Sequence, residues 1–144
     1  MLKVVESVTS GHLHVMEYPA ALERVGGDLQ LLQEVAQLFL DEYPGTLERI
    51  RQGLERGSAK DVEHEAHTLK GSVANFEAAP TVRAALALET LGRSGSVENG
   101  GFLFRALTRE LDRLRPVLEA IVRGESAAET LAAKAQAPPA PRLL

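Results

Sequence analysis

Apolar residues recur every three or four positions along most of this chain, a spacing that predicts amphipathic helices. The longest such run lies between Asp28, a suitable N-cap, and Gly57, a residue typical of helix ends. Its apolar positions are Leu32, Val35, Phe39, Tyr43, Leu47, Ile50 and Leu54. Pro44 lies inside the run. Because the stripe continues in phase beyond the proline, we expect one kinked helix rather than two helices.

A second helix is predicted directly after Gly57. Its start resembles a capping box formed by Ser58 and Asp61, with the aspartate in place of the usual Glu or Gln. The apolar stripe of this helix consists of Val62, Ala66, Leu69, Val73 and Phe76. The stripe covers about 80° of the helix surface, which predicts one buried face and a wide polar face.

Three further elements are predicted from the same kind of pattern. A short helix is expected over 19–25, and another over 80–91, where Val82, Leu86 and Leu88 are the larger apolar residues. The polar, glycine-rich segment 92–101 is predicted to be a loop. The last helix is expected over 102–122 and contains Pro116; its stripe consists of Leu103, Leu107, Leu111, Leu114, Leu118 and Ile121.

Four substantial helices with short connections predict an all-α, up-down four-helix bundle with a short extra N-terminal helix. We assign residues 1–16 to an N-terminal leader and residues 17–123 to the bundle domain. Residues 124–144 are rich in Ala, Pro and Ser, a composition that predicts a flexible, disordered tail.

Composition narrows the classes of function. The 144 residues fit one domain, and the net charge of -4 gives no basis for general affinity for nucleic acid or anionic membranes. Cysteine is absent, which excludes disulfides and thiolate chemistry. No stretch resembles a signal peptide or reaches the about 18 apolar residues of a membrane span. We therefore expect a cytoplasmic protein, and a monomer because one chain supplies the whole bundle.

The second predicted helix carries a histidine on the face expected to point to water. His67 falls about 140° from the centre of the apolar stripe, and Gly71 about 180° from it. Lys70 lies at the flank, about 80° from the core direction. Glycine inside a helix is about 1 kcal/mol less favourable than alanine, so Gly71 suggests space cleared beside the histidine.

This arrangement suits reversible phosphorylation on nitrogen. Neutral imidazole is a competent nucleophile near pH 7, since its unperturbed pKa is about 6.5. A phosphoryl group on His67 would carry negative charge, which Lys70 could balance. The chain has no Ser-His-Asp arrangement and no glycine-rich phosphate loop for ATP. It therefore supplies a nucleophile without a nucleotide site.

Two plainer interpretations stand beside this one. A lone histidine on a helix is usually a solvated surface residue. His64 and His67, three residues apart, could also bind a metal weakly, although the zinc-protease motif requires a spacing of four. Asp61 and His64 form a single acid-x-x-His unit, whereas a di-iron bundle needs two Glu-x-x-His units and further carboxylates. A metal-binding bundle is accordingly the weakest alternative.

The run Ala66-His67-Thr68-Leu69-Lys70-Gly71-Ser72-Val73-Ala74-Asn75-Phe76 resembles the signature of histidine-containing phosphotransfer (HPt) domains. The resemblance extends over about residues 18–122. It implies a four-helix bundle whose exposed histidine carries phosphate between aspartates of response-regulator receiver domains. By position, His67 would be phosphorylated and Lys70 would stabilise the phosphoryl group. His64, Gly71 and Ala74 would contribute to the docking surface.

The chain departs from the family pattern at two positions near the end of this helix. Val73 replaces a second small residue, and Glu77 replaces a glycine. Neither position coincides with His67, Lys70 or Gly71. Ser72 and Asn75 match the usual small and polar positions, and no chemistry is assigned to them.

The sequence thus predicts a phosphorelay intermediate that accepts a phosphoryl group on His67 and passes it on. It would have no kinase activity and no cofactor of its own, since the receiver domain would bring Mg²⁺. Its partners would be receiver domains, a hybrid sensor histidine kinase, or both. The alternative is a non-catalytic docking or inhibitory bundle that binds a receiver or kinase through the same surface.

Overall fold

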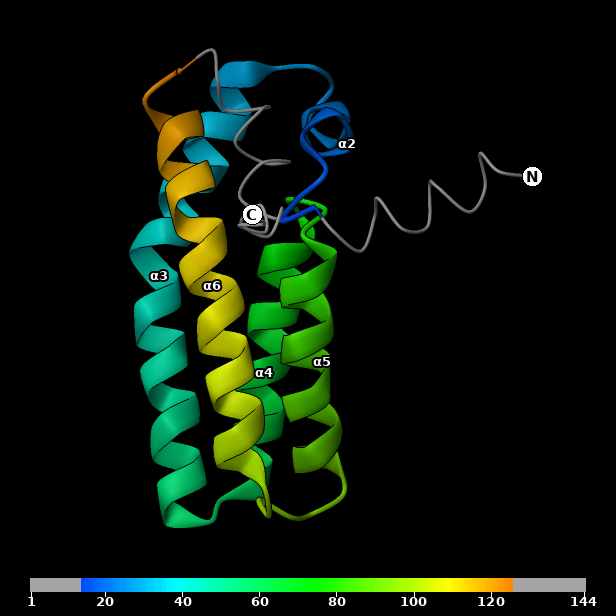
Figure 1. Cartoon of the computed structure of the whole chain (residues 1–144), viewed down its shortest axis with the longest axis vertical. Helices are drawn as coiled ribbons and strands as arrows, with labels where there is room; N and C mark the ends of the chain where they lie inside the picture. Colours follow the sequence, from blue (N-terminus) through cyan, green and yellow to red (C-terminus); the bar gives the residue numbers. More distant parts are fainter. Residues whose placement is uncertain (1–13, 126–144) are drawn as a thin grey trace, which may run out of the picture.

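A computed structural model describes residues 14–125, in which helices are joined by short turns and no strand occurs. The helices are α2 (Tyr18–Arg24), α3 (Leu29–Arg56), α4 (Ala59–Ala74), α5 (Ala79–Arg93) and α6 (Gly100–Val122). Helices α3 to α6 run up and down as a bundle, and α2 lies across one end (Figure 1). The predicted fold class is confirmed. Residues 126–144 of the expected tail and residues 1–13 of the expected leader lie outside the described residues.

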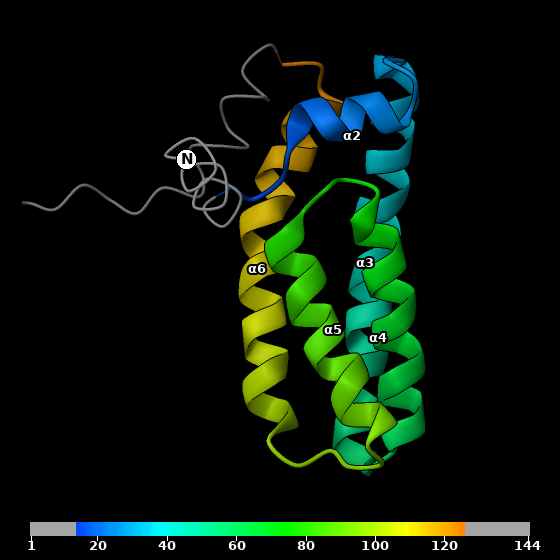
Figure 2. The same cartoon turned by 90° about the vertical axis from the view of Figure 1, so that its right-hand side faces the viewer.

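Each long helix packs against its two neighbours around the bundle. Helix α4 contacts α3 and α5, and α6 contacts the same two helices from the opposite side. Figure 2 shows α4 and α5 side by side, joined at the end that α2 covers. The core between the four helices is filled by fully buried aliphatic side chains and by an aromatic cluster; Phe39 stacks on Tyr43 and meets Phe76 edge to face.

Helix α3 begins and ends at the residues that the sequence predicted. The Asp28 side chain accepts a hydrogen bond from the Leu31 amide at 3.1 Å, which satisfies one free N–H of the first turn. Gly57 closes the helix with a left-handed φ of 72°. The helix continues through Pro44, whose side chain is exposed. One helix rather than two is therefore confirmed.

Helix α4 begins at the predicted cap and ends earlier than expected. Ser58 accepts a hydrogen bond from the Asp61 amide at 3.4 Å, and the helix stops at Ala74. Phe76 is buried in the turn that follows. Glu77 adopts a φ of 52°, a left-handed conformation that a glycine adopts without steric strain.

The N-terminal strap, residues 14–17, stabilises the unusual turn. The Glu77 carbonyl accepts a hydrogen bond from the Glu17 amide at 3.0 Å, and its carboxylate pairs with Arg24 at 2.7 Å. Val15 and Met16 are 2% and 1% exposed and belong to the core. Val15 and Met16 thus pack with the bundle although they precede the expected domain boundary at residue 17.

The glycine-rich segment 92–101 contains the predicted loop, but the loop is shorter than expected and covers only residues 94–99. Helix α5 continues to Arg93, and α6 already begins at Gly100, after Asn99 with a left-handed φ of 65°. Gly92 and Gly100 are buried between helices. Their lack of a side chain serves close packing rather than a turn, and composition alone does not distinguish the two uses.

The end of α6 includes the first residues that we assigned to the tail. Gly124 has a left-handed φ of 71°, and the Glu125 amide donates to the Ala120 carbonyl at 3.0 Å. This is a glycine-based C-terminal cap. No helix among residues 14–125 combines the length and apolar character that a membrane span needs.

Candidate functional site

His67 stands on the outer surface of α4 with one side of its ring held from α5. Its side chain is 65% exposed, yet ring atom Nδ1 lies 2.9 Å from Oε2 of Glu89. Glu89 comes from α5, about one turn before the end of that helix and 22 residues later in the chain. The packing of α4 against α5 therefore fixes the orientation of an otherwise exposed side chain.

Glu89 is a buried carboxylate that contacts three nitrogen-bearing side chains. It is only 2% exposed. Its Oε2 accepts from His67 and from Nη2 of Arg93 at 2.5 Å, and Nζ of Lys70 lies 2.7 Å from Oε1. Lys70 and Glu89 therefore form an ion pair between α4 and α5. Two cations thus compensate one buried charge.

This environment keeps Glu89 ionised. The Lys70 ammonium is the main cause, with His67 contributing less, and together they outweigh burial and lower the pKa of Glu89 from 4.5 to about 2. A carboxylate can only accept hydrogen bonds. We therefore assign the proton of the neutral His67 ring to Nδ1, which leaves the lone pair on Nε2 facing away from Glu89.

The other residues predicted for the site lie on the same face of α4. His64, Gly71 and Ala74 are three, four and seven positions from His67, spacings that share one side of a helix. His64 and Gly71 are exposed and Ala74 is half-buried. A side chain added at Gly71 would meet nothing within 4 Å, so this glycine leaves open surface beside His67.

A charged notch lies on the surface beside the histidine, lined by side chains of α4 and α5. It has a volume of about 360 Å³ and is lined by Lys60, Glu63, His64, His67, Glu89 and Arg93. Arg93 bridges the notch, since its Nε also donates to Glu63 at 3.3 Å. The notch places several titratable groups around one exposed nucleophile. Within residues 14–125 no group of three or more metal-ligating side chains is arranged to hold a metal ion, so nothing there supports the metal-binding alternative.

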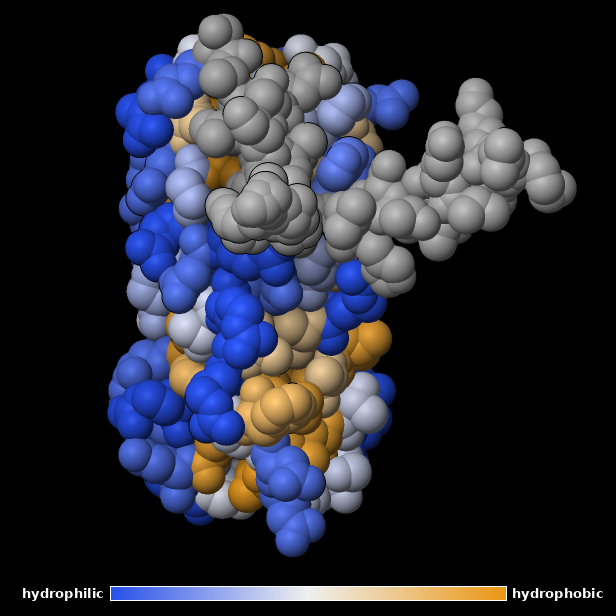
Figure 3. Space-filling model, in the orientation of Figure 1, coloured by the Kyte–Doolittle hydropathy of each residue, from blue (hydrophilic) through white to orange (hydrophobic). Residues whose placement is uncertain are grey.

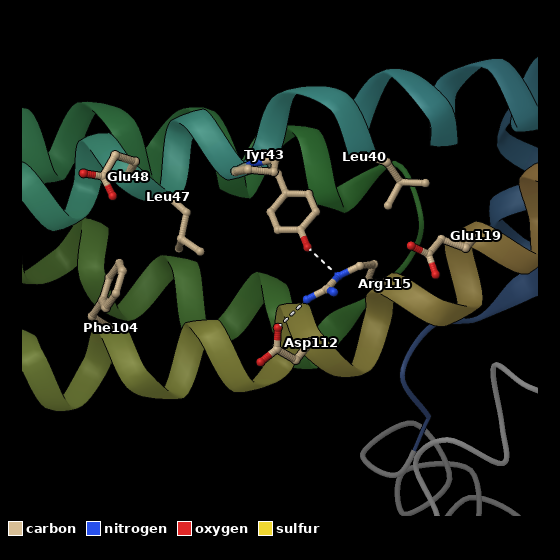
Figure 4. A pocket seen from close by; sticks show the side chains of 9 residues that line it. Leu40, Tyr43, Leu47, Glu48, Phe104, Asp112, Arg115 and Glu119 are labelled. Carbon is tan, nitrogen blue, oxygen red and sulfur yellow. Dashed lines mark hydrogen bonds and ion pairs between the residues drawn. The ribbon is translucent and has the colours of Figure 1, made fainter.

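A larger groove lies on the opposite side of the bundle, between α3 and α6 (Figure 4). Its volume is about 460 Å³. Arg115 crosses it, donating from Nε to the Tyr43 hydroxyl at 3.0 Å and pairing with Asp112 at 2.7 Å. Leu40, Leu47 and Phe104 add apolar lining. These polar groups are committed to one another, and no exposed nucleophile faces the groove.

Apolar side chains also reach the surface away from the histidine. Figure 3 shows them gathered over the lower parts of α5 and α6. Phe102, in the first turn of α6, is 67% exposed, more than any other large apolar side chain of the described residues. Leu86 of α5 is 40% exposed. It lies on α5 about one turn before Glu89, the partner of His67.

Sequence reasoning found His67 and Lys70 but missed Glu89 and Arg93. A signal for Glu89 was present, because it shares the inward face of α5 with Ala85 and Gly92, where a charged residue is out of place. Its partner could not be identified without knowing how α5 packs on α4. Arg93 gave no such signal, since exposed arginines are common.

Comparison with known protein families gives one match. A family model described as the Hpt domain matches residues 34–116, more than half of the chain. The match includes Glu89 and the three side chains that contact it, whereas the strap and α2 lie outside it. Comparisons with curated proteins and with solved structures found no match.

Proposed function

The chain belongs to the Hpt domain family, and we propose that it is a phosphorelay intermediate that carries a phosphoryl group on His67. Members of this family take part in histidine phosphotransfer and are carriers rather than kinases. One observation supports the assignment to His67 most strongly. Its Nδ1 is held by the buried, ionised Glu89, so the free Nε2 is presented outward as a nucleophile.

The proposed step is an in-line transfer between aspartate and histidine. The Nε2 lone pair forms a bond to phosphorus while the bond from phosphorus to the aspartyl oxygen breaks, and the aspartate leaves as a carboxylate. No proton is released, because His67 keeps its Nδ1 proton and its ring becomes positively charged. Glu89 balances that charge at 2.9 Å. Delivery to a second receiver is the same step in reverse.

Lys70 and Arg93 would balance the charge of the transferred group. Both now pair with Glu89, and Arg93 shares the very oxygen that holds His67. A phosphoryl group beside them offers several negatively charged oxygens, a strong competitor for these cations. We propose that both turn partly from Glu89 towards the phosphoryl group. The receiver domain supplies Mg²⁺, so most of the chemistry here is positioning and electrostatics.

The receiver would dock over the face of α4 that carries the nucleophile. His64, Gly71 and Ala74 lie on that face, and Leu86 adds an exposed apolar side chain from α5. A standard protein interface covers about 800 Å² on each partner, enough to include all four. The open surface at Gly71 permits the close approach that phosphoryl transfer requires.

The partners in this proposal are cytoplasmic receiver domains, alone or as part of a hybrid sensor kinase. The alternative is a bundle that docks on the same partners without carrying phosphate. The two proposals make opposite predictions about His67. A docking bundle needs only the surface around it, whereas a carrier needs its Nε2.

The test is transfer from a phosphorylated receiver to the wild-type chain and to His67→Gln. We expect acid-labile phosphate on the wild type and none on the variant. His14→Gln is the matched control, because His14 lies in the strap and pairs with Glu17. It should accept phosphate at the wild-type rate. If His67→Gln still acquires acid-labile phosphate, or binds and signals as well as the wild type, the carrier proposal is wrong.

A further inference from the structure

Helices α4 and α5 touch backbone to backbone at Gly92. A Cβ atom added there would lie 2.6 Å from the carbonyl oxygen of Ala59, 2.6 Å from the amide nitrogen of Glu63 and 2.9 Å from its Cα. These separations are shorter than van der Waals contact, and none of the three atoms belongs to a flexible side chain. The two helices reach this separation only because residue 92 has no side chain.

The other helical glycines do not have this role. A Cβ at Gly53 of α3 would meet the Val62 side chain of α4 at 3.1 Å, and at Gly100 it would meet the end of the Leu54 side chain. Gly71 faces open space. Among the helical glycines of residues 14–125, Gly92 alone would bring Cβ within 3.0 Å of the backbone of another helix.

This contact lies next to the residues that hold the histidine. Glu89 precedes Gly92 by three positions, about 4.5 Å along the helix, and Arg93 follows it directly. The Glu89 carboxylate reaches His67 Nδ1 at 2.9 Å from a fully buried position. N–H···O hydrogen bonds span about 2.7–3.2 Å between the heavy atoms, so an outward shift of α5 that takes this distance beyond the range would release the ring.

We propose that Gly92 is a positioning residue for phosphotransfer. By allowing α5 to approach α4, it sets the separation at which Glu89 holds the Nδ1 side of His67 and leaves Nε2 free. The consequence for transfer rests on the proposed function of His67. The geometric claim concerns the unphosphorylated protein and is tested separately. A glycine with only a packing role would affect stability without changing the state of the ring.

The experiment compares Gly92→Ala with Gly53→Ala, which disturbs the opposite flank of α4. Nitrogen NMR of the His67 ring reports which nitrogen carries the proton. We expect Gly92→Ala to lose the Nδ1-protonated preference and to slow transfer from a phosphorylated receiver about tenfold to a hundredfold. Gly53→Ala should lose stability as well, yet keep the wild-type ring state and transfer within twofold.

Two results would overturn the proposal: a wild-type ring state in folded Gly92→Ala, or the same loss of ring state in Gly53→Ala. If Gly92→Ala does not fold alone, it is measured in a Gly45→Ala background. Gly45 is exposed, and an added Cβ would meet only the end of Arg49 at 3.5 Å. Phosphorylation of the wild type with phosphoramidate tests His67 itself. Failure there rejects the carrier function, while the ring-state comparison still decides the role of Gly92.

Discussion

The two hollows on opposite sides of the bundle differ in whether their reactive groups are free. The groove between α3 and α6 is larger, about 460 Å³, but the Tyr43 hydroxyl already accepts from Arg115. The notch between α4 and α5 is about 360 Å³ and holds an imidazole whose Nε2 faces away from its partner Glu89. An uncommitted lone pair on a fixed ring, rather than the size of a hollow, marks the site.

The two sides also differ in how the helices meet. Arg115 and Tyr43 link α6 to α3 through long side chains. Helix α5 meets α4 through the backbone at Gly92, and the buried Glu89 lies one turn away. The closer contact is the one between α4 and α5, where a small displacement of α5 would move Glu89 away from the ring of His67. Catalytic groups require such placement, since misplacement by about 1 Å can slow a reaction by about a hundredfold.

The largest difference between the two sides should appear in the rate of phosphoryl transfer when Glu89 or Tyr43 is replaced. Glu89→Gln keeps the shape of the side chain but removes the charge that balances the phosphorylated ring. We expect transfer from a phosphorylated receiver to slow about tenfold to a hundredfold, measured in single-turnover assays. Tyr43→Phe removes the acceptor of Arg115 across the groove and should leave the rate within twofold. Equal transfer rates for the wild type and both variants would mean that Glu89 matters no more to transfer than Tyr43 does.

Apolar exposure gives the next comparison. Leu86 lies on α5 about one turn before Glu89 and is 40% exposed, whereas Phe102 lies in the first turn of α6 and is 67% exposed. Leu86→Asp should raise the Kd for a receiver about tenfold, which is about 1.4 kcal/mol. Phe102→Asp should change it less than twofold. Calorimetric titration measures both Kd values. A larger effect from Phe102 would mean that the receiver docks over α6 rather than over the face that carries His67.

Acid should reduce the stabilising contribution of Glu89, on the α4–α5 side, but not that of Tyr43, on the α3–α6 side. The pKa of Glu89 is lowered from 4.5 to about 2, chiefly by Lys70, so its stabilising contribution is complete above about pH 4.5 and is lost as the pH falls towards 2. The difference in unfolding free energy between the wild type and Glu89→Gln should therefore shrink over this range. The corresponding difference for Tyr43→Phe should stay constant. Urea unfolding at several pH values measures both differences. If the difference between the wild type and Glu89→Gln stays constant, Glu89 is not held ionised by its partners.

The smallest effect is expected at Gly71, and it should have opposite signs for stability and docking. An alanine there meets nothing within 4 Å and favours the helix, so stability should rise by about 0.5–1 kcal/mol. Binding of a receiver should weaken, because the methyl group occupies the surface that it approaches. Urea unfolding and a binding titration test the two signs. A loss of stability would mean that Gly71 serves the fold.

Much of this fold follows from local patterns. The three-and-four spacing located the four long helices, and Asp28, Ser58 and Gly57 marked ends that the structure confirms. The outward position of His67 followed from the same helical wheel. These features depend on residues close in sequence, so one chain without a structure is enough to predict them.

The features that sequence reasoning missed depend on contacts between distant segments. Glu89 acquires its meaning only when α5 packs on α4, and Gly92 was interpreted as a loop residue because close helix packing leaves no local pattern. The burial of Val15 and Met16 likewise depends on where the strap crosses the bundle. Glu77 shows the same limit, since its left-handed turn is stabilised by Arg24 from another element.

The central claim is that Glu89 holds Nδ1 so that Nε2 of His67 takes the phosphoryl group. Its most direct test is to phosphorylate the wild-type chain with phosphoramidate and locate the phosphorus by phosphorus–nitrogen NMR. We predict a single phosphohistidine, at His67, with phosphorus bonded to Nε2 and the proton retained on Nδ1. Phosphorus on Nδ1, on another residue, or on no histidine at all would contradict the account.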